Sequence, residues 1–343
     1  MRRRVFFVSM VMSIAALCSC RGMEPDDAGK DNTETGHGKT AMVRFEKSGS
    51  TEVFYVALQD RISKSKYFVF SVNHYRNHGE EQYMDLWRLN GAQLEMYAKA
   101  DGTFSVMTGN LLTNGENESV FRDCSDESTM ADFTGGYHGD ERIDMEEGCG
   151  VKFYIDDVEI APEMLASSFG WVECDKFHYV QTSAMYKTGQ KVNGVFIASD
   201  HRVVADHVKT TVFGDSGYNT VNRLVFREEM PIYWYCGICC VGHNLAEKGY
   251  NEDFNVEIFD SSGANRLDAV GHNEFHAWND SNGVEVNIAS RMLGGGDDSQ
   301  CRMFIWDTKA YAKYYRRIPA NGSMPVSSGT VLEAEMDVRM NVR

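Results

Sequence analysis

Eight consecutive residues, Thr134 to Glu141, carry the side chains best suited to chemistry in this sequence. They read Thr-Gly-Gly-Tyr-His-Gly-Asp-Glu, which places a phenol, an imidazole and two adjacent carboxylates among three glycines. Glycine lets the backbone adopt positive φ angles and lets a ligand approach closely, and histidine titrates near neutral pH. We therefore expect a loop that brings Tyr137, His138 and Glu141 to a site. A tight surface loop with solvated charges would have the same composition.

A second polar cluster is carried by two segments in the middle of the chain that alternate apolar and polar residues. Residues two apart on a strand share a face, so His207 and Lys209 point the same way. If the segments pair as a hairpin, these side chains lie beside Tyr218 and Asn222, or beside Arg223 after a slip of one residue. The cluster would then form a polar cleft, with ordinary cross-strand pairs on a solvated sheet face as the alternative.

A third pattern, His272-Asn-Glu-Phe-His276, has the spacing of two metal ligands on a helix. Gly271 before it and Trp278-Asn279-Asp280 after it favour a loop or a strand instead. We therefore expect no cofactor, apart from a possible structural calcium ion. The five tryptophans are suited to stacking on sugar rings, although packing in the core is their commoner use.

The short alternating segments that must position these residues predict an all-β protein. Runs such as Val284–Ile288 alternate with period two, and no long segment has the helical period of 3.6. Asn90-Gly91 between alternating segments predicts a hairpin, Gly214–Gly217 predicts another turn, and Pro162–Leu165 predicts one helical turn. Together these signals predict a large antiparallel β-sandwich of the jelly-roll type with few short helical turns.

The first residues have the features of an export signal. Three arginines precede an apolar run from Val5 to Leu17, which is too short for a membrane-spanning helix of about 20 residues. A basic segment, a short apolar segment and small residues at a cleavage site are typical of a signal peptide, here residues 1–19. Leu17-Cys18-Ser19-Cys20 resembles a bacterial lipobox, which would make Cys20 the lipid anchor. An ordinary cleaved signal peptide is the alternative.

The residues after Cys20 divide into a polar segment and a long β-rich segment. Residues 20–42 are rich in Gly, Asp, Glu, Asn and Thr and have few large apolar side chains, so we predict a flexible tether. Residues 43–343, about 300 in number, suit one large β domain. We therefore expect a single sandwich domain that stands off the membrane on its tether.

The net charge limits the choice of partners. The whole chain carries −16, and removal of residues 1–19 deletes three arginines and no acidic residue, which leaves −19. A nucleic acid needs a basic surface, so we exclude it as a partner. A strongly polyanionic glycan is also disfavoured unless a local basic patch overrides the overall field.

Seven of the nine cysteines remain after Cys18 and Cys20, so at least one exported thiol is unpaired. Cys124 and Cys149 flank the Gly-Gly-Tyr-His loop, and a disulfide between them would restrict its motion. Cys236-Gly-Ile-Cys-Cys has metal-like spacing, but its apolar neighbours favour buried thiols on a strand.

The order of these features, from the glycine-rich loop to the His-x-Lys and Tyr/Asn segments, resembles jelly-roll polysaccharide lyases over roughly Thr134 to Arg227. The lipobox and tether resemble those of lipoproteins from glycan-degrading Bacteroidetes. The resemblance implies β-elimination on a uronic-acid-containing polysaccharide, with His138 or His207 as base and Tyr218 as acid. It also implies that the substrate is bound by Tyr137, Glu141, Lys209, Asn222 and Arg223.

The expected partners are a polysaccharide or oligosaccharide substrate and the membrane, through a lipid anchor in the bacterial cell envelope, at the outer membrane or on its periplasmic side. Two other functions fit the same residues. One is a non-catalytic surface lipoprotein that binds glycans, and the other is a glycoside hydrolase with a carboxylate pair. Asp140 and Glu141 are adjacent and would point apart on a strand, so a hydrolase needs a second carboxylate from elsewhere.

Overall fold

The computed structural model describes residues 39–343, except for 80–82, 99–101, 112–119, 124–133, 135–139, 145, 188–189, 193–194, 198–200, 243–247, 252–256, 260–265, 271–272, 309–310 and 320. The predicted signal peptide, the anchor at Cys20 and most of the tether lie outside the described residues and stay predictions. Residues Lys39–Arg343 form one compact unit, and its first strand starts at Ala41.

The main sheet has 17 strands, and its first layer comes mostly from the N-terminal third of the chain. The layer pairs, in spatial order, β10 (Phe169–Cys174), β1 (Ala41–Ser48), β2 (Thr51–Gln59), β3 (Lys66–His78), β4 (Tyr83–Ala98) and β5 (Thr103–Val106). All these pairings are antiparallel.

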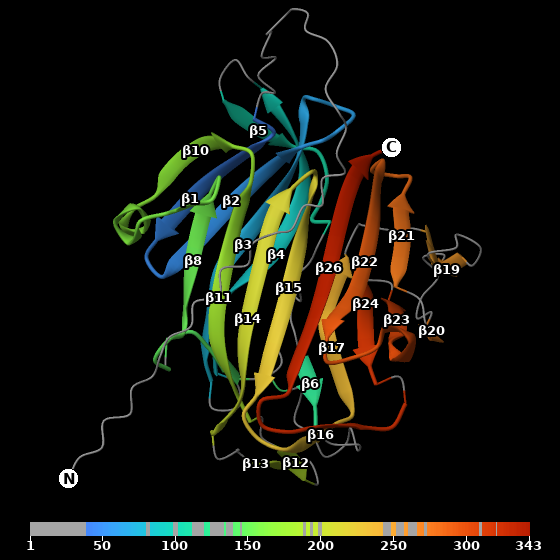
Figure 1. Cartoon of the computed structure of the whole chain (residues 1–343). Helices are drawn as coiled ribbons and strands as arrows, with labels where there is room; N and C mark the ends of the chain where they lie inside the picture. Colours follow the sequence, from blue (N-terminus) through green and yellow to red (C-terminus); the bar gives the residue numbers. More distant parts are fainter. Residues whose placement is uncertain are drawn as a thin grey trace, which may run out of the picture. The chain divides into compact units, whose positions relative to one another are not determined.

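The second layer of the sheet is longer and faces the viewer in Figure 1. It pairs, in spatial order, β8 (Gly150–Ile155), β11 (Phe177–Tyr186), β14 (Val203–Gly214), β15 (Gly217–Phe226), β26 (Val331–Val342), β22 (Val284–Gly294), β21 (Glu274–Asn279) and β18 (Lys248–Asn251). The short strands β9 (Val158–Glu159) and β19 (Glu257–Phe259) extend its two ends. The C-terminal strand β26 therefore lies in the middle of this layer.

The two layers are joined by the three-residue strand β7 (Asp140–Arg142). It pairs in parallel with β4 at Met84 and Asp85, and antiparallel with β11 at Ala184 to Tyr186. The sheet thus passes from the first layer to the second through β7.

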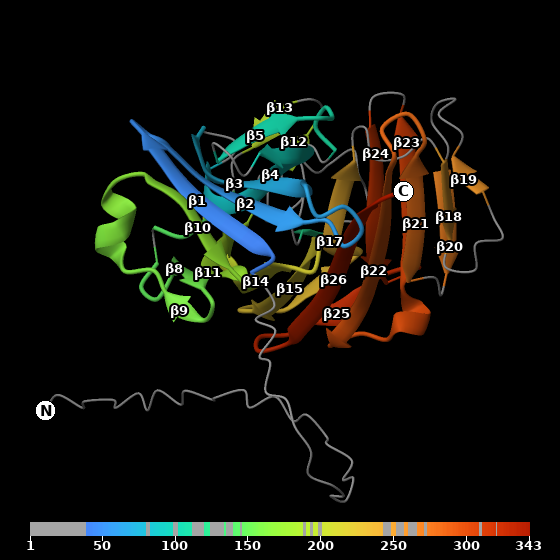
Figure 2. The same cartoon turned by 90° about the horizontal axis from the view of Figure 1, so that it is seen from above.

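A second, five-stranded sheet lies behind β26 and β22 in Figure 1, and the view from above in Figure 2 shows it beside them. Its order is β20 (Arg266–Val270), β23 (Arg302–Thr308), β24 (Tyr311–Ile318), β17 (Trp234–Gly242) and β6 (Val120–Arg122). Two small pairs, β12 (Gln190–Val192) with β13 (Val195–Ile197) and β16 (Met230–Ile232) with β25 (Met324–Val326), complete the strands. The predicted all-β antiparallel sandwich is confirmed.

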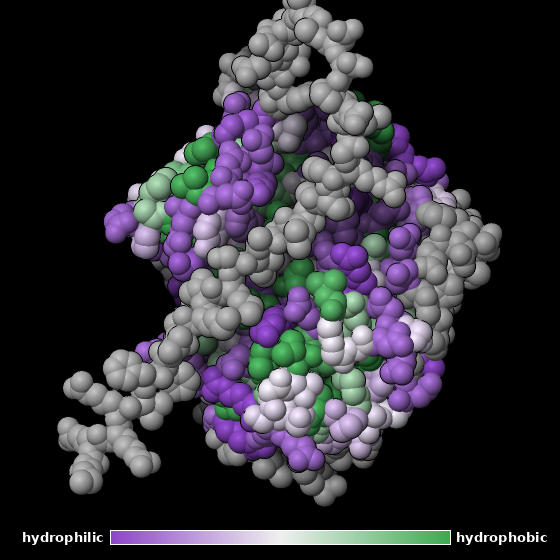
Figure 3. Space-filling model, viewed as in Figure 1, coloured by the Kyte–Doolittle hydropathy of each residue, from purple (hydrophilic) through white to green (hydrophobic). Residues whose placement is uncertain are grey.

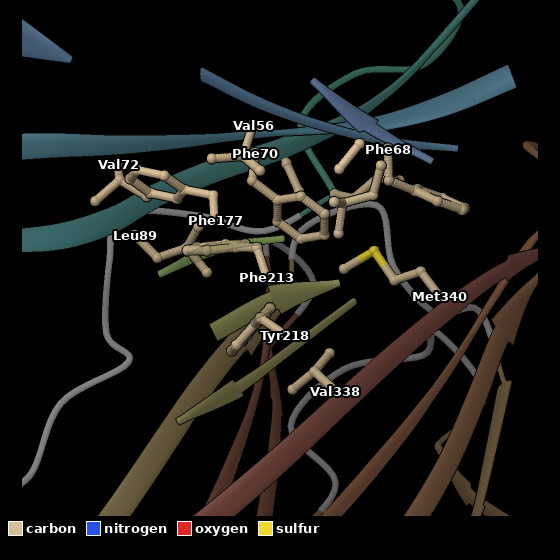
Figure 4. Packing of buried hydrophobic residues seen from close by; sticks show 14 of the residues in the cluster. Val56, Phe68, Phe70, Val72, Leu89, Phe177, Phe213, Tyr218, Val338 and Met340 are labelled. Carbon is tan, nitrogen blue, oxygen red and sulfur yellow. The ribbon is translucent and has the colours of Figure 1, made fainter. Parts of the chain in front are cut away.

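Aromatic side chains fill the space between the layers, because every second residue of each strand points inward. Phe70 of β3 lies 5.5 Å from Phe213 of β14 and 5.9 Å from Tyr218 of β15, measured between ring centroids. Figure 4 shows these rings together with Phe177 and Met340, which come from two further strands. The layers are therefore held by a continuous apolar core.

The predicted turn at Gly214–Gly217 is confirmed and is a tight hairpin. β14 ends at Gly214 and β15 begins at Gly217, and both turn residues, Asp215 and Ser216, have positive φ angles of 50° and 62°. Two positive φ angles in a two-residue loop match the right-handed twist of the flanking strands.

The hairpin predicted at Asn90-Gly91 is wrong. β4 runs without a break from Tyr83 to Ala98. Its register with β3 shifts by one residue, since Ser71 pairs with Gly91 and the next residue, Val72, pairs with Leu89. Asn90 is therefore the extra residue of a β-bulge, a feature that also favours glycine. A Cβ at position 91 would lie 2.7 Å from Oδ1 of Asn110, so a larger residue there would have to displace a side chain that accepts a hydrogen bond from the Ala92 N–H.

The helical content is small, as the sequence predicts. Pro162–Ala166 forms a 3-10 helix, η2, which confirms the predicted turn, and Asp298–Gln300 forms a second one, η3. Among the described residues there is no helix with the length and hydropathy needed to cross a membrane.

Candidate functional site

Several predicted site residues lie outside the described part of the chain. Tyr137 and His138 fall in the gap at 135–139, and Cys124 falls in the gap at 124–133. Cys149 is half-buried and its thiol is free in the structure. The catalytic role of His138 and the bridge between Cys124 and Cys149 therefore stay predictions.

The predicted residues Glu141, His207 and Asn222 form one network inside the sandwich. Nδ1 of His207 lies 2.7 Å from Oε1 of Glu141, and Nε2 lies 2.8 Å from Oδ1 of Asn222. The hydroxyl of Ser183, on β11, donates to the same Glu141 oxygen at 2.5 Å. Both imidazole nitrogens of His207 therefore have hydrogen-bond partners within the protein.

The network is closed to solvent. Glu141 and His207 are each 2% exposed and Asn222 is 0% exposed. Burial alone would raise the pKa of Glu141, but the charge and hydrogen bond of His207, together with Lys209 and Ser183, lower that pKa to about 2. The carboxylate is thus ionised and satisfied, which is the state expected of a buried structural charge.

Lys209 binds the backbone of the opposite layer. Its ammonium donates to the carbonyl oxygen of Trp87 at 2.8 Å, and the Trp87 N–H donates to Oε1 of Gln181 at 2.7 Å. The pairing of β4 with β7 involves only Met84 and Asp85, so the Trp87 backbone would otherwise lack partners on this side. Lys209 and Gln181 thus supply the hydrogen-bond partners that a neighbouring strand would otherwise provide.

Tyr218 and Arg223 lie away from this network. Tyr218 pairs with Phe213, is 1% exposed and contacts Phe70 in the apolar core. Arg223 points to the outer face of β15, where it lies 3.6 Å from Glu333. The sequence therefore places His207, Lys209 and Asn222 together correctly, while the structure does not bring Tyr218 or Arg223 to them.

The outer face of the second layer carries a polar pocket of about 430 Å³. It lies over β15, β26, β22 and β21, and in Figure 3 hydrophilic residues gather over this part of the sheet. The register places Glu274, Ala289, Asp337 and Asn219 in one row across the four strands. The small side chain of Ala289 forms the floor, with a carboxylate on each side.

The polar groups of the pocket hold one another in fixed positions. Glu335 accepts a hydrogen bond from Nδ2 of Asn219 at 2.9 Å and another from Nε of Arg291. Arg339 donates to both oxygens of Asp337, at 2.7 and 2.6 Å. Paired groups on rigid strands give the pocket oriented donors and acceptors before any ligand arrives.

A smaller hollow of about 110 Å³ continues the pocket toward β21 and shares Glu274, Ala289 and Asp337 with it. His276 lines this hollow, and its ring lies 5.5 Å from that of Trp278. Burial lowers the pKa of His276, and Glu285 offsets this effect only in part. An aromatic pair thus lies beside the polar row.

Sequence reasoning missed this pocket, although β26 carries a signal. Glu333, Glu335, Asp337, Arg339 and Asn341 occupy every second position of this strand and point outward. Among the described residues, no group of three or more His, Cys, Asp or Glu side chains is placed to hold a metal ion. The expectation about cofactors stays a prediction.

The fold and the pocket define a two-layer β-sandwich protein with a polar hollow on one sheet face. No protein-family model matches the chain, and no curated protein sequence matches it. Similar solved structures include a galactose mutarotase-like protein from Clostridium acetobutylicum, at 9% identity and a TM-score of 0.40, covering 88% of this chain and 98% of that one.

Two further structures are similar. The Slr1438 protein from Synechocystis is 8% identical with a TM-score of 0.37, over 88% of this chain and 96% of that one. The 4-alpha-glucanotransferase from Thermococcus litoralis is 9% identical with a TM-score of 0.34, over 87% of this chain and 39% of that one. At these TM-scores none of the likenesses supports an inference about the site or its ligand.

Proposed function

We propose that this protein binds glycans in the pocket on the outer face of β15, β26, β22 and β21. The observation that carries the proposal is the row of Glu274, Ala289, Asp337 and Asn219, in which hydrogen-bonding groups flank a small apolar floor. A sugar ring has the complementary form, with a flat carbon face and hydroxyl groups around its edge. A volume of about 430 Å³ falls within the usual range of small-ligand pockets, which starts at about 300 Å³.

Burial argues against the alternative site at His207. A general base must come within hydrogen-bond reach of the proton that it removes, yet His207 is 2% exposed and both of its ring nitrogens have protein partners. Tyr218 is packed among phenylalanines. The outer pocket, in contrast, is open to a ligand. With the predicted anchor at Cys20, the protein would hold a glycan at the cell envelope.

The proposal is tested by filling the floor of the pocket. Ala289→Phe places a ring where the sugar would lie and alters none of the charged groups. We expect this variant to bind oligosaccharides about tenfold more weakly or worse, since a tenfold loss corresponds to about 1.4 kcal/mol. Isothermal titration calorimetry with oligosaccharides that bind the wild-type protein provides the measurement.

Val180→Phe is the matched control, because Val180 lies on the same outer face but on β11, three strands from β26. It should bind as the wild-type protein does. Unchanged binding by the Ala289 variant, with its fold intact by circular dichroism, would place the ligand elsewhere.

A second candidate function is β-elimination on a uronic-acid-containing polysaccharide. The favouring observation is that Glu141, which follows the predicted loop residues Tyr137 and His138 closely in the sequence, contacts His207. Elimination leaves an unsaturated uronate, which absorbs near the ultraviolet edge, whereas binding alone leaves no such product. Turnover of hyaluronan, chondroitin, heparin, alginate or pectin, with and without calcium, would therefore support a lyase.

The lyase candidate makes one specific prediction. His138→Ala should abolish cleavage without unfolding the protein, because the imidazole would be the base. Normal turnover by this variant would remove His138 from the site.

A further inference from the structure

The arginines described below, on the outer face of the second layer, are already paired with carboxylates. Arg291 donates to Glu335, and Arg339 forms a two-bond pair with Asp337. Beyond the pocket, Arg223 lies 3.6 Å from Glu333 and Arg343 lies 2.9 Å from Asp280. A bound anion would therefore compete with these carboxylates for the same guanidinium groups.

Glu274 differs from the other pocket carboxylates. Its side chain is exposed, and it forms no ion pair or hydrogen bond with side chains in the described part of the chain. Ala289 separates Glu274 on β21 from Asp337 on β26. At the usual strand spacing the backbones of these two strands are roughly 10 Å apart. The pocket thus holds one carboxylate whose charge the described residues leave unbalanced.

Among the described side chains that line the pocket and the adjoining hollow, no further cation offsets that charge. His276 lines the adjoining hollow, and burial lowers the pKa of its imidazole, which favours the neutral ring. The chain as a whole carries −16, so the surrounding field attracts cations and repels anions.

We infer that the glycan bound in this pocket carries free amino groups, so that an ammonium of an amino sugar pairs with Glu274 while hydroxyl groups contact Asp337 and Asn219. This inference rests on the proposed function and names its ligand class. It separates the pocket from a uronate site, because a uronate would bring a further negative charge beside Glu274, Glu335 and Asp337.

The test compares short oligomers of glucosamine, N-acetylglucosamine and glucuronic acid by titration calorimetry at low and high salt. Acetylation removes the charge and keeps the ring. We expect glucosamine to bind about fivefold more tightly than its acetylated form at low salt, and the difference to shrink at high salt as the ion pair is screened. Glucuronic acid should bind most weakly.

Glu274→Gln should abolish the difference between glucosamine and N-acetylglucosamine. Glu333→Gln removes the same charge outside the pocket and should preserve the difference. Equal binding of all three oligomers, or tightest binding of glucuronic acid, would overturn the amino-sugar inference and leave glycan binding standing. If neither these three oligomers nor any neutral oligosaccharide binds, both the amino-sugar inference and the proposed glycan binding are overturned.

Discussion

Glu141 shows how one residue connects distant parts of this chain. Its carboxylate lies 66 positions from His207 in sequence and contacts both His207 and Ser183. Alternation along a strand predicts that His207 and Lys209 share a face, because that spacing is local. It does not predict the contact of His207 with Glu141, since this contact depends on the pairing of β7 with both β4 and β11.

The first prediction concerns the pH dependence of stability. The pKa of Glu141 falls from 4.5 to about 2 on folding, so the residue stabilises the fold by about 3 kcal/mol above pH 4.5. This contribution is lost as the pH falls through about 2. Urea denaturation of the wild type and of Glu141→Gln should differ most at neutral pH and converge toward pH 2.

Glu52 also stabilises the fold in a way that is lost in acid, and it is present in both the wild type and the Glu141→Gln variant. Burial raises its pKa, but Lys47, His74 and Arg76 lower it to about 2. Only the difference between the two pH profiles reports on Glu141. Parallel profiles would contradict the assignment.

The second prediction concerns Lys209. Lys209→Met removes the donor to the Trp87 carbonyl and leaves that oxygen buried, so the free energy of unfolding should fall by about 1–3 kcal/mol. Arg223→Met breaks an exposed pair on the opposite face of the same hairpin and should cost less than about 1 kcal/mol. Equal losses in chemical denaturation would show that Lys209 has no special structural role.

At the scale of the strand, period-two alternation locates most of the segments but not their neighbours. Asn90-Gly91 shows the limit, because the same residues suit a hairpin turn and a bulge, and the long partner strand β3 decides between them. The pocket escaped prediction for a similar reason. Its row joins β21, β22, β26 and β15, and the register that aligns Glu274 with Asp337 is absent from any single segment.

The third prediction uses two strand glycines. A Cβ on Gly217 would lie 1.9 Å from the carbonyl oxygen of Val338 on β26, so Gly217→Ala must displace one strand and should cost about 1–3 kcal/mol or more. A Cβ on Gly170 of β10 meets nothing within 4 Å, so Gly170→Ala should be nearly neutral. Thermal unfolding of both variants provides the comparison, and similar midpoints would contradict it.

For the whole molecule, the sequence predicts one large β domain, and the described residues from Lys39 onward form one compact unit. The order of strands does not follow from the sequence. β26 is last in the chain, yet it pairs with β15 on one side and with β22 on the other. Only long-range pairing places the C-terminal residues at the centre of a layer.

The fourth prediction follows from that position. Deletion of residues 331–343 should abolish folding, because it separates β15 from β22 and exposes two new sheet edges. A protein that starts at Lys39 should fold normally, because the compact unit begins there. Circular dichroism and gel filtration distinguish the two outcomes, and a folded monomer without β26 would contradict the prediction.

The contact of Lys209 and Gln181 with the backbone of Trp87 has a consequence for self-association. An unpaired stretch of backbone in β4 would act as a template for fibre formation by a second molecule, since unpaired N–H and C=O groups recruit extended chains. Two side chains from the facing layer already occupy those groups. Their loss would therefore be expected to promote amyloid-type aggregation as well as unfolding.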